Sequence, residues 1–326
     1  MANTGFHLIF PGQGSQHPGM GRFLFENFPI ARQAFEEASD SVGLDLKKLC
    51  FDGSDSDLAL TENTQPCLLT VSTATQRVLL SQLGLTPVVA SGHSIGEYAA
   101  LVAAQALPFS AAVRAVRTRG QAMQAAVPVG QGSMAAVMGL EPSEVEKMCA
   151  WTVQESRLGP LSPANFNSPG QIVISGKADA IQWLQENLKP EELFGTAKRV
   201  RLIPLQVSAP FHCEMMAPAE EKMREVLTEI PFQTAKFPII QNYTAQLETK
   251  AELLRENLIR QVSAPVRWMQ SMDLAKQKGY TTCIECGAGK VLQGLLKKID
   301  STAFRVFNTN SLEDIENIEK FAKELS

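Results

Sequence analysis

Two kinds of hydrophobic pattern alternate along the chain. Short apolar runs, which predict strands, lie at 6–10, 86–91, 237–241, 280–285 and 303–307. Segments with apolar residues every three to four positions separate them. These predict helices at 21–38, 64–84, after residue 95, at 214–229, twice between 250 and 278, at 290–299 and at the C-terminus. Strands that alternate with helices predict an α/β fold with a mostly parallel sheet, covered by helices on both faces.

The order of elements changes in the middle of the chain. Strands are expected at 133–139, 160–167, 171–176 and 198–205, and helices at 141–154 and 177–188. This βαββαβ order is typical of the ferredoxin-like unit. We therefore expect a ferredoxin-like subdomain at 130–205, inserted into a larger core made of 1–129 and 206–326.

Composition excludes several classes of protein. The chain has 326 residues, 44% of them hydrophobic and 20% charged, as in an ordinary globular enzyme. A formal net charge of −4 and the lack of a basic patch with interleaved aromatics argue against a nucleic-acid partner. The first residues lack a basic segment followed by a long apolar one, and no run of about 18 apolar residues occurs. We expect a cytoplasmic protein without a membrane span.

The six cysteines do not predict a disulfide framework or a metal site. Only Cys283 and Cys286 form a C-x-x-C pair, and a structural zinc would need a second pair of ligands at similar spacing. The surrounding "TTCIECGAG" has the pattern of a strand that runs into a glycine turn, not of a redox motif at the start of a helix. We expect no metal here.

The stretch "SGHSIGEYAA" predicts a catalytic nucleophile. Gly92, Ser94 and Gly96 have the spacing Gly-x-Ser-x-Gly between a predicted strand and a predicted helix, as a nucleophile elbow requires. The backbone N–H of Ile95, at the helix start, would then face a developing oxyanion. So short a pattern also arises by chance, and its place between strand and helix is what favours the functional reading.

A serine nucleophile needs a base, and the chain has four histidines. His7 lies in the first strand and is typical of a core or edge residue, and His17 is typical of a solvated position. His93 directly precedes the serine, so we expect it to give a supporting hydrogen bond. His212 lies in the proline-containing loop "VSAPFHCEMMAP" between a strand and a helix, C-terminal to the serine as in α/β-hydrolases, which favours it as the base.

Six motifs in order give the chain a resemblance to a known family. It is similar to the malonyl-CoA:acyl carrier protein transacylases, which include acyltransferases of polyketide synthases, from about residue 6 to residue 310. The motifs are "IFPGQGSQ", "GHSIGEYAALV", "RTRGQAMQ", "NFNSPGQIVISG", "VSAPFHCEMM" and "RQVSAPVRW". The resemblance implies an α/β-hydrolase-like core with the inserted ferredoxin-like subdomain. Where that family usually has Gly-Pro-Gly, this chain has Gly287-Ala288-Gly289.

The resemblance also implies roles for single residues. Ser94 would be acylated by malonyl-CoA, His212 would be its base, and Gln261 would orient the histidine through its backbone carbonyl. Gln13 and Ile95 would form the oxyanion hole. Arg119 would bind the malonyl carboxylate, with His93 and Phe211 beside the substrate and Phe211 crowding any α-methyl branch. Without the resemblance, Arg119 and Gln261 are more typical of solvated helix positions.

The implied reaction requires no resident cofactor, because the CoA thioester is a substrate and the phosphopantetheine arm belongs to the carrier protein. Such carriers are usually acidic. "AKRVR" (197–201) and "LKKI" (296–299) therefore offer Lys198, Arg199, Lys297 and Lys298 as candidate contacts, although clusters of this size are also typical of solvated surface. Nothing in the sequence requires more than a monomer.

Two other functions use the same residues differently. An acyl-serine hydrolase or proofreading thioesterase would share Ser94 and His212, but a buried Arg119 is not expected in the acyl pocket of a general esterase. A carrier-binding scaffold without chemistry would be expected to lack one of these three residues. The sequence does not separate a carrier protein of fatty-acid synthesis from one of polyketide synthesis.

Overall fold

A six-stranded sheet forms the centre of the protein. The computed structural model describes residues 5–207 and 209–325. All neighbouring strands of this sheet are parallel except the last pair, so the expected mostly parallel sheet is confirmed. In spatial order the strands are β10 (Arg305–Phe307), β9 (Thr282–Glu285), β1 (Phe6–Phe10), β2 (Pro87–Gly92), β7 (Ile239–Ile240) and β8 (Leu247–Glu248).

Helices cover both faces of this sheet, as strand β1 shows. Leu8 and Phe10 join the largest apolar cluster, whereas Ile9, which points to the other face, packs with Trp268. The Ile9 face is covered by α13 (Trp268–Gln277) and α14 (Val291–Ile299). The other cluster contains residues of α1 (Arg22–Asn27), α2 (Pro29–Val42), α3 (Leu46–Asp52), α4 (Asp55–Ala59), α5 (Thr61–Arg77), α6 (Gly96–Ala103), α7 (Phe109–Ala125), α11 (Ala217–Thr228), α12 (Ala251–Arg260) and α15 (Leu312–Leu325).

Three of the predicted helices differ from those in the structure. The helix expected at 21–38 is broken at Phe28, which is extended because Pro29 follows it and opens the next helix. The helix expected at 64–84 begins at Thr61 and ends in a π-helical turn, Val78–Gln82. The helix expected at 214–229 opens with a 3-10 turn, Glu214–Met216. The short elements α3, α4 and β8 have too few residues to show a period.

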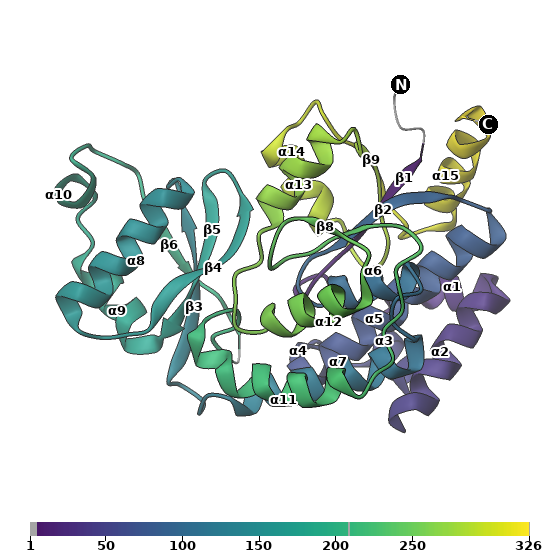
Figure 1. Ribbon diagram of the computed structural model, residues 1–326, viewed down its shortest axis with the longest axis horizontal. Coiled ribbons are helices and arrows are strands. Elements are labelled where there is room, and N and C mark those ends of the chain that lie inside the picture. Colours follow the sequence, from purple (N-terminus) through teal and green to yellow (C-terminus); the bar gives the residue numbers. More distant parts are fainter. Residues whose placement is uncertain (1–4, 208, 326) are drawn as a thin grey trace.

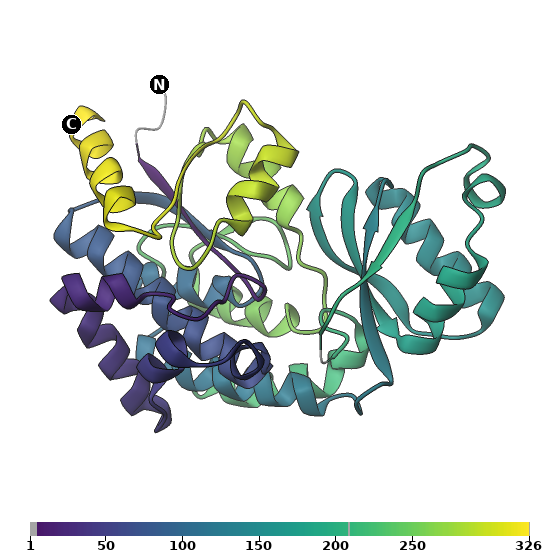
Figure 2. The same ribbon diagram turned by 180° about the vertical axis from the view of Figure 1, so that it is seen from behind.

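A second sheet, with four antiparallel strands, lies at one end of the molecule, opposite α15 (Figures 1 and 2). Its order is β4-β5-β3-β6. Along the chain the elements are β3 (Gly132–Met138), α8 (Pro142–Ser156), β4 (Leu161–Ser168), β5 (Gln171–Lys177), α9 (Ala178–Asn187), α10 (Pro190–Phe194) and β6 (Arg201–Pro204). One face packs against α8 and α9, and Met134 and Ala136 on the other face join the main apolar cluster.

Backbone hydrogen bonds join strand β4 of the small sheet to the core. Phe166 donates to the carbonyl of Val266 at 2.9 Å, and Val266 donates to the carbonyl of Ala164 at 2.8 Å. Val266 follows α12 in the core, so this pairing is a contact in addition to the two chain connections, which lie before β3 and after β6.

The turn between β2 and α6 has no room for side chains at its glycines. A Cβ on Gly92 would lie 1.9 Å from the carbonyl carbon of Gly96, and one on Gly96 would lie 2.1 Å from the carbonyl oxygen of Phe10. Ser94 between them has a φ of 52°, in the left-handed region that a serine rarely adopts. Close packing on β1 thus forces the turn, and the turn projects Ser94.

We expect Gly92→Ala to lower the free energy of unfolding by about 2 kcal/mol or more, because the added methyl group meets backbone atoms that cannot move aside. Gly294→Ala is the matched control: it lies in α14 with no atom within 4 Å of the added Cβ. That change should stabilise the protein by about 0.5–1 kcal/mol. Urea unfolding of the three proteins measures both. A Gly92→Ala variant as stable as the wild type would contradict this account of the turn.

Candidate active site

Ser94 and His212 lie in direct contact, although 118 positions separate them. The Oγ of Ser94 is 2.7 Å from Nε2 of His212, and Nδ1 of His212 is 2.9 Å from the backbone carbonyl oxygen of Gln261. A carbonyl oxygen only accepts, so Nδ1 carries the proton and donates it. Nε2 is then free to accept the hydroxyl proton of Ser94, as a general base must.

The environment of His212 keeps the imidazole neutral. The ring is buried, and burial, together with the nearby positive charge of Arg119, lowers the pKa of His212 to about 3. Its backbone has a φ of 58°, so the loop holds this residue, like Ser94, in the left-handed region. A neutral base beside the serine is therefore present across the neutral range.

Arg119, from α7, is the buried cation of the site, with 1% of its surface exposed. One terminal nitrogen donates to Oε1 of Gln65 at 3.0 Å. The other donates to the Ser94 Oγ at 3.1 Å and to Oε1 of Gln261 at 3.0 Å. Burial lowers the pKa of Arg119, while Tyr98 and Glu97 raise it. Its Nε is buried and has no hydrogen-bond partner among the described residues.

A cavity of about 120 Å³ opens over these side chains, between the core and the small sheet. Ser94, His212 and Arg119 line it together with nine other residues. These are Gln13, Gln65, His93, Met123, Met134, Asn165, Leu205, Val207 and Phe211. Met134 and Asn165 come from β3 and β4, so the small sheet supplies one wall.

The remaining residues implied by the resemblance lie at or next to this cavity. Gln13 follows Gly12, whose loop packs against the turn: a Cβ on Gly12 would lie 2.6 Å from the carbonyl oxygen of His93. Ile95 forms the N-cap of α6. His93 directs Nε2 to Oδ1 of Asn167 on β4 at 2.8 Å, which is the supporting hydrogen bond expected of it.

The other two histidines lie where the sequence suggested. His7 is fully buried in β1, with its Nε2 2.5 Å from the hydroxyl of Ser91. His17 is exposed. The cysteine pair lies at the end of β9, and all six cysteines are free and buried.

Sequence reasoning missed several residues around the reacting groups. Asn242 accepts the backbone N–H of Ser94 at 2.7 Å and donates to the carbonyl of Gly92 at 2.6 Å, so it braces the turn. Glu97 is a fully buried carboxylate one helical turn after Ser94. Gln65 holds Arg119 from α5. In the sequence, the apolar run that follows Glu97 could have indicated its burial, whereas Gln65 follows the polar stretch "TENT".

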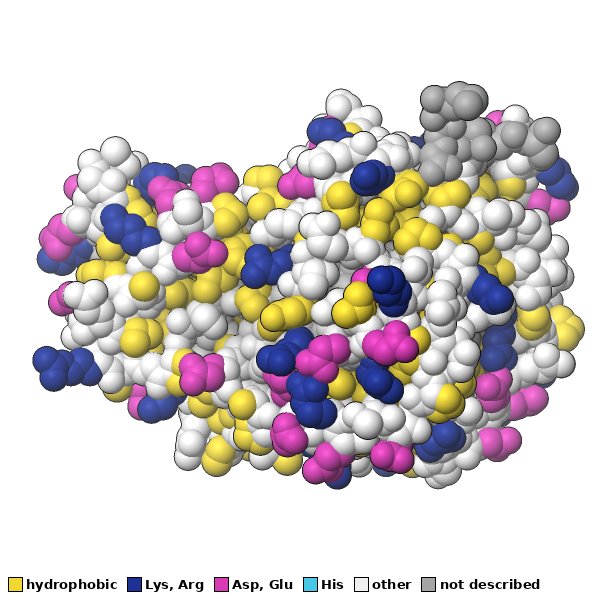
Figure 3. Space-filling view, in the orientation of Figure 1, with side chains coloured by type: hydrophobic (Ala, Val, Ile, Leu, Met, Phe, Trp, Pro, Cys, Tyr) yellow, Lys and Arg dark blue, Asp and Glu magenta, His cyan; other side chains and the backbone are white. Residues whose placement is uncertain are grey.

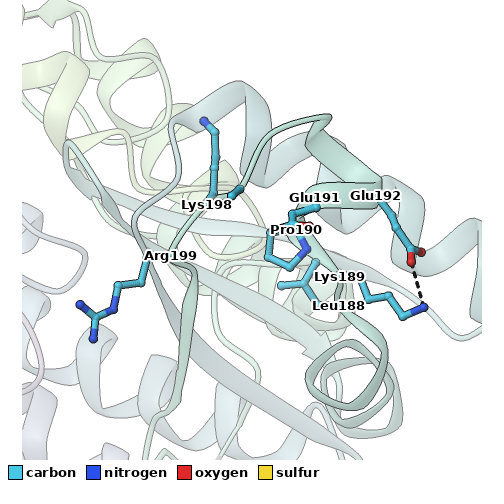
Figure 4. A pocket seen from close by; sticks show the side chains of 8 residues that line it. Leu188, Lys189, Pro190, Glu191, Glu192, Lys198 and Arg199 are labelled. Carbon is cyan, nitrogen blue, oxygen red and sulfur yellow. Dashed lines mark hydrogen bonds and ion pairs between the residues drawn. The ribbon is translucent and has the colours of Figure 1, made fainter.

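The four candidate carrier contacts lie in the segment before β6 and on α14, outside the cavity. Lys198 is paired with Glu144 of α8, and with Arg199 it borders a surface pocket that also includes Pro190 of α10 (Figure 4). Lys298 donates to Oε1 of Gln171 at 2.6 Å, across the junction of core and small sheet. On the face drawn in Figure 3, positive and negative side chains are intermingled.

No three His, Cys, Asp or Glu side chains among residues 5–207 and 209–325 are grouped so as to hold a metal ion. Over the same part of the chain, no helix combines the length and the apolar character needed to cross a bilayer.

Comparisons with known proteins identify the family of the chain. The acyl transferase domain family matches residues 7–308. The malonyl CoA-acyl carrier protein transacylase of Bacillus subtilis is 44% identical over 312 residues, which is 96% of this chain and 94% of that protein. The protein of the same name from Salmonella typhimurium is 42% identical over 300 residues, 92% of this chain and 94% of its own.

Solved structures give the same result. An acyl carrier protein S-malonyltransferase from Vibrio cholerae superposes with a TM-score of 0.89 at 41% identity, covering 96% of this chain and 99% of that one. A malonyl-transacylase solved in complex with its type II PKS acyl-carrier protein superposes with a TM-score of 0.89 at 38% identity, covering 97% and 99%. The resemblance seen in the motifs is confirmed, and the chain belongs to the acyl transferase family of the malonyl CoA-acyl carrier protein transacylases.

Proposed function

We propose that this acyltransferase moves a malonyl group from malonyl-CoA to the phosphopantetheine thiol of an acyl carrier protein through a malonyl-Ser94 intermediate. The observation that carries the proposal is the joint contact of Ser94 Oγ with the base His212 and the buried cation Arg119. The names of the relatives support malonyl and carrier protein as substrates. A cavity of about 120 Å³ admits only a small acyl group.

In the first half-reaction, Ser94 Oγ attacks the thioester carbonyl while its proton passes to Nε2 of His212. The backbone N–H groups of Ile95 and Gln13 stabilise the oxyanion. Collapse of the intermediate breaks the C–S bond, and His212 returns the proton to the departing CoA thiolate. Gln261 holds the imidazole through its carbonyl, so Ser94 and His212 act as a dyad without a carboxylate in contact.

In the second half-reaction, the carrier thiol gives its proton to His212 and attacks the malonyl-serine carbonyl. Breaking of the C–O bond releases malonyl-carrier, and Ser94 takes the proton back. Arg119 binds the free carboxylate of the malonyl group through two parallel charge-assisted hydrogen bonds, which acetyl cannot form. Phe211, at the cavity wall, crowds an α-methyl branch and disfavours methylmalonyl.

We also propose that residues 130–205 form a ferredoxin-like subdomain inserted into an α/β-hydrolase-like core, 1–129 and 206–326. The antiparallel order β4-β5-β3-β6, with α8 and α9 on one face, supports this. The carrier then docks at the mouth of the cavity, where core and subdomain meet. Lys297 and Lys298 on one side, and Lys198 and Arg199 on the other, are the proposed contacts for its acidic surface.

Brief mixing with malonyl-CoA should add one malonyl group to the wild type and none to Ser94→Ala, as read by intact-protein mass spectrometry. Arg119→Ala should lower the preference for malonyl-CoA over acetyl-CoA about a hundredfold or more, because two bonds of about 1.5–3 kcal/mol each are lost. Arg114→Ala, an exposed arginine on the same helix, is the control. Release of CoA without an adduct would show a hydrolase instead.

The imidazole of His212 should stay neutral from pH 8 to pH 5. Burial and Arg119 lower its pKa to about 3, so the base is lost only when the pH falls well below this range. In NMR spectra of histidine-labelled protein, assigned with His212→Ala, its ring resonance should not shift over that interval. Arg119→Ala removes the neighbouring cation and should move the midpoint toward 6.5. A wild-type midpoint above pH 6 would contradict the proposed electrostatics.

Charge reversal tests each of the two proposed patches of carrier contacts separately. Lys297→Glu with Lys298→Glu should raise the KM for the carrier protein several-fold, because acidic carrier and enzyme then repel one another. Acylation by malonyl-CoA alone should be unaffected. Lys198→Glu with Arg199→Glu tests the other patch in the same assay. If neither pair changes the carrier KM, the docking surface lies elsewhere.

A further inference from the structure

Glu97 is a buried carboxylate that the proposed mechanism does not use. It lies in α6 one turn after Ser94, with none of its surface exposed. Its oxygens accept three N–H groups: Nε2 of Gln241 at 3.0 Å, the backbone N of Asn242 at 2.8 Å and Nε2 of Gln261 at 3.0 Å. Burying a charge is costly unless it is fully hydrogen-bonded, so this side chain has a role that offsets the cost.

The carboxylate determines which way the Gln261 amide faces. An ionised carboxylate only accepts hydrogen bonds, so the NH₂ end of Gln261 must point to it. That nitrogen also donates to the carbonyl of Ser94 at 3.0 Å. The amide oxygen of Gln261 is thereby turned toward Arg119, whose guanidinium donates to it at 3.0 Å. With the amide reversed, an NH₂ group would face the guanidinium and repel it.

Arg119 depends on this orientation because its hydrogen bonds all go to uncharged acceptors, on Gln65, Ser94 and Gln261. The amide of Gln65 is held more loosely: within the described part of the chain, its nitrogen meets only the sulfur of Met123, at 3.9 Å, which is a weak acceptor. Gln261 is thus the anchor of Arg119 that is itself fixed by a charged group. Glu97 also raises the pKa of Arg119 by its negative charge, which stabilises the buried cation.

We propose that Glu97 is a positioning residue for acyl-group selection: through the side-chain amide of Gln261 it holds Arg119 where the free carboxylate of the acyl group binds. The proposal rests on the proposed function, because it concerns how Arg119 distinguishes malonyl from acetyl. It gives the side chain of Gln261 a task separate from that of its backbone carbonyl, which holds His212.

The test is the ratio of kcat/KM for malonyl-CoA to that for acetyl-CoA in Ser94 acylation, measured by rapid quench. Glu97→Gln keeps the size of the side chain but has an NH₂ group of its own, which can oppose the NH₂ of Gln261. The Ser94 carbonyl is then the remaining acceptor that fixes the Gln261 amide, so the amide is held less firmly. We expect the ratio to fall at least about tenfold, with a higher KM for malonyl-CoA. The assay is run at pH 8, above the value of about 7 to which burial raises the pKa of Glu97.

Two controls separate this role from a structural one. Glu285→Gln removes another fully buried carboxylate, which accepts the backbone N–H groups of Leu292 and Gln293 at the start of α14. Its acyl-CoA ratio should equal that of the wild type. In an Arg119→Ala background, Glu97→Gln should leave the ratio unchanged, since the two residues act in one chain of contacts and their effects are then not additive.

Gln261→Leu is the second variant, and it carries the test if Glu97→Gln does not fold. It keeps the backbone carbonyl that binds His212 but removes the amide, so the ratio should fall as in Glu97→Gln. Equal losses for malonyl-CoA and acetyl-CoA in these variants, or a further loss on top of Arg119→Ala, would overturn the proposal. A wild type that is not acylated at Ser94 would instead contradict the proposed function.

Discussion

The burial of the Arg119 guanidinium next to Ser94 is the constraint to which the rest of the site is fitted. Burying a cation is costly unless it is hydrogen-bonded, and α5, the turn after β2 and the residue that follows α12 each supply an acceptor to its terminal nitrogens. Burial lowers the pKa of His212, and the charge of Arg119 lowers it further. In the proposed mechanism, Arg119 therefore acts both on substrate selection and on the strength of the base.

The contact between Ser94 and His212 depends in turn on two strained backbones. Ser94 and His212 both have a positive φ, at 52° and 58°. Such conformations are unfavourable by about 1–3 kcal/mol each, and they persist because their surroundings leave no alternative. Asn242 bonds the backbone on both sides of His93, and tight packing of Gly92 and Gly96 against backbone atoms excludes a wider turn. The contact between serine and histidine is thus fixed before any substrate arrives.

Much of this was predictable from the sequence, for definable reasons. The glycines around Ser94 and the proline before His212 indicate turns in the sequence. Hydrophobic periodicity predicted every strand of the core except β8, which has two residues. Periodicity could not find the helix break at Phe28, because the apolar spacing continues through it. Glu97, Gln65 and Asn242 were missed because their partners lie far along the chain, and Glu97 in particular sits in a helix where a carboxylate is normally solvated.

The pairing of β4 with Val266 has a mechanical consequence. A small sheet joined to the core by two chain connections can rotate about the line through them. The hydrogen bonds at Val266, and the one between His93 and Asn167, attach the small sheet to the core at points away from that line. They therefore restrict this rotation. These contacts hold the small sheet, which supplies Met134 and Asn165 to the cavity wall, against the core. In the proposed reaction, a cavity held in this way favours a short acyl group over a longer one.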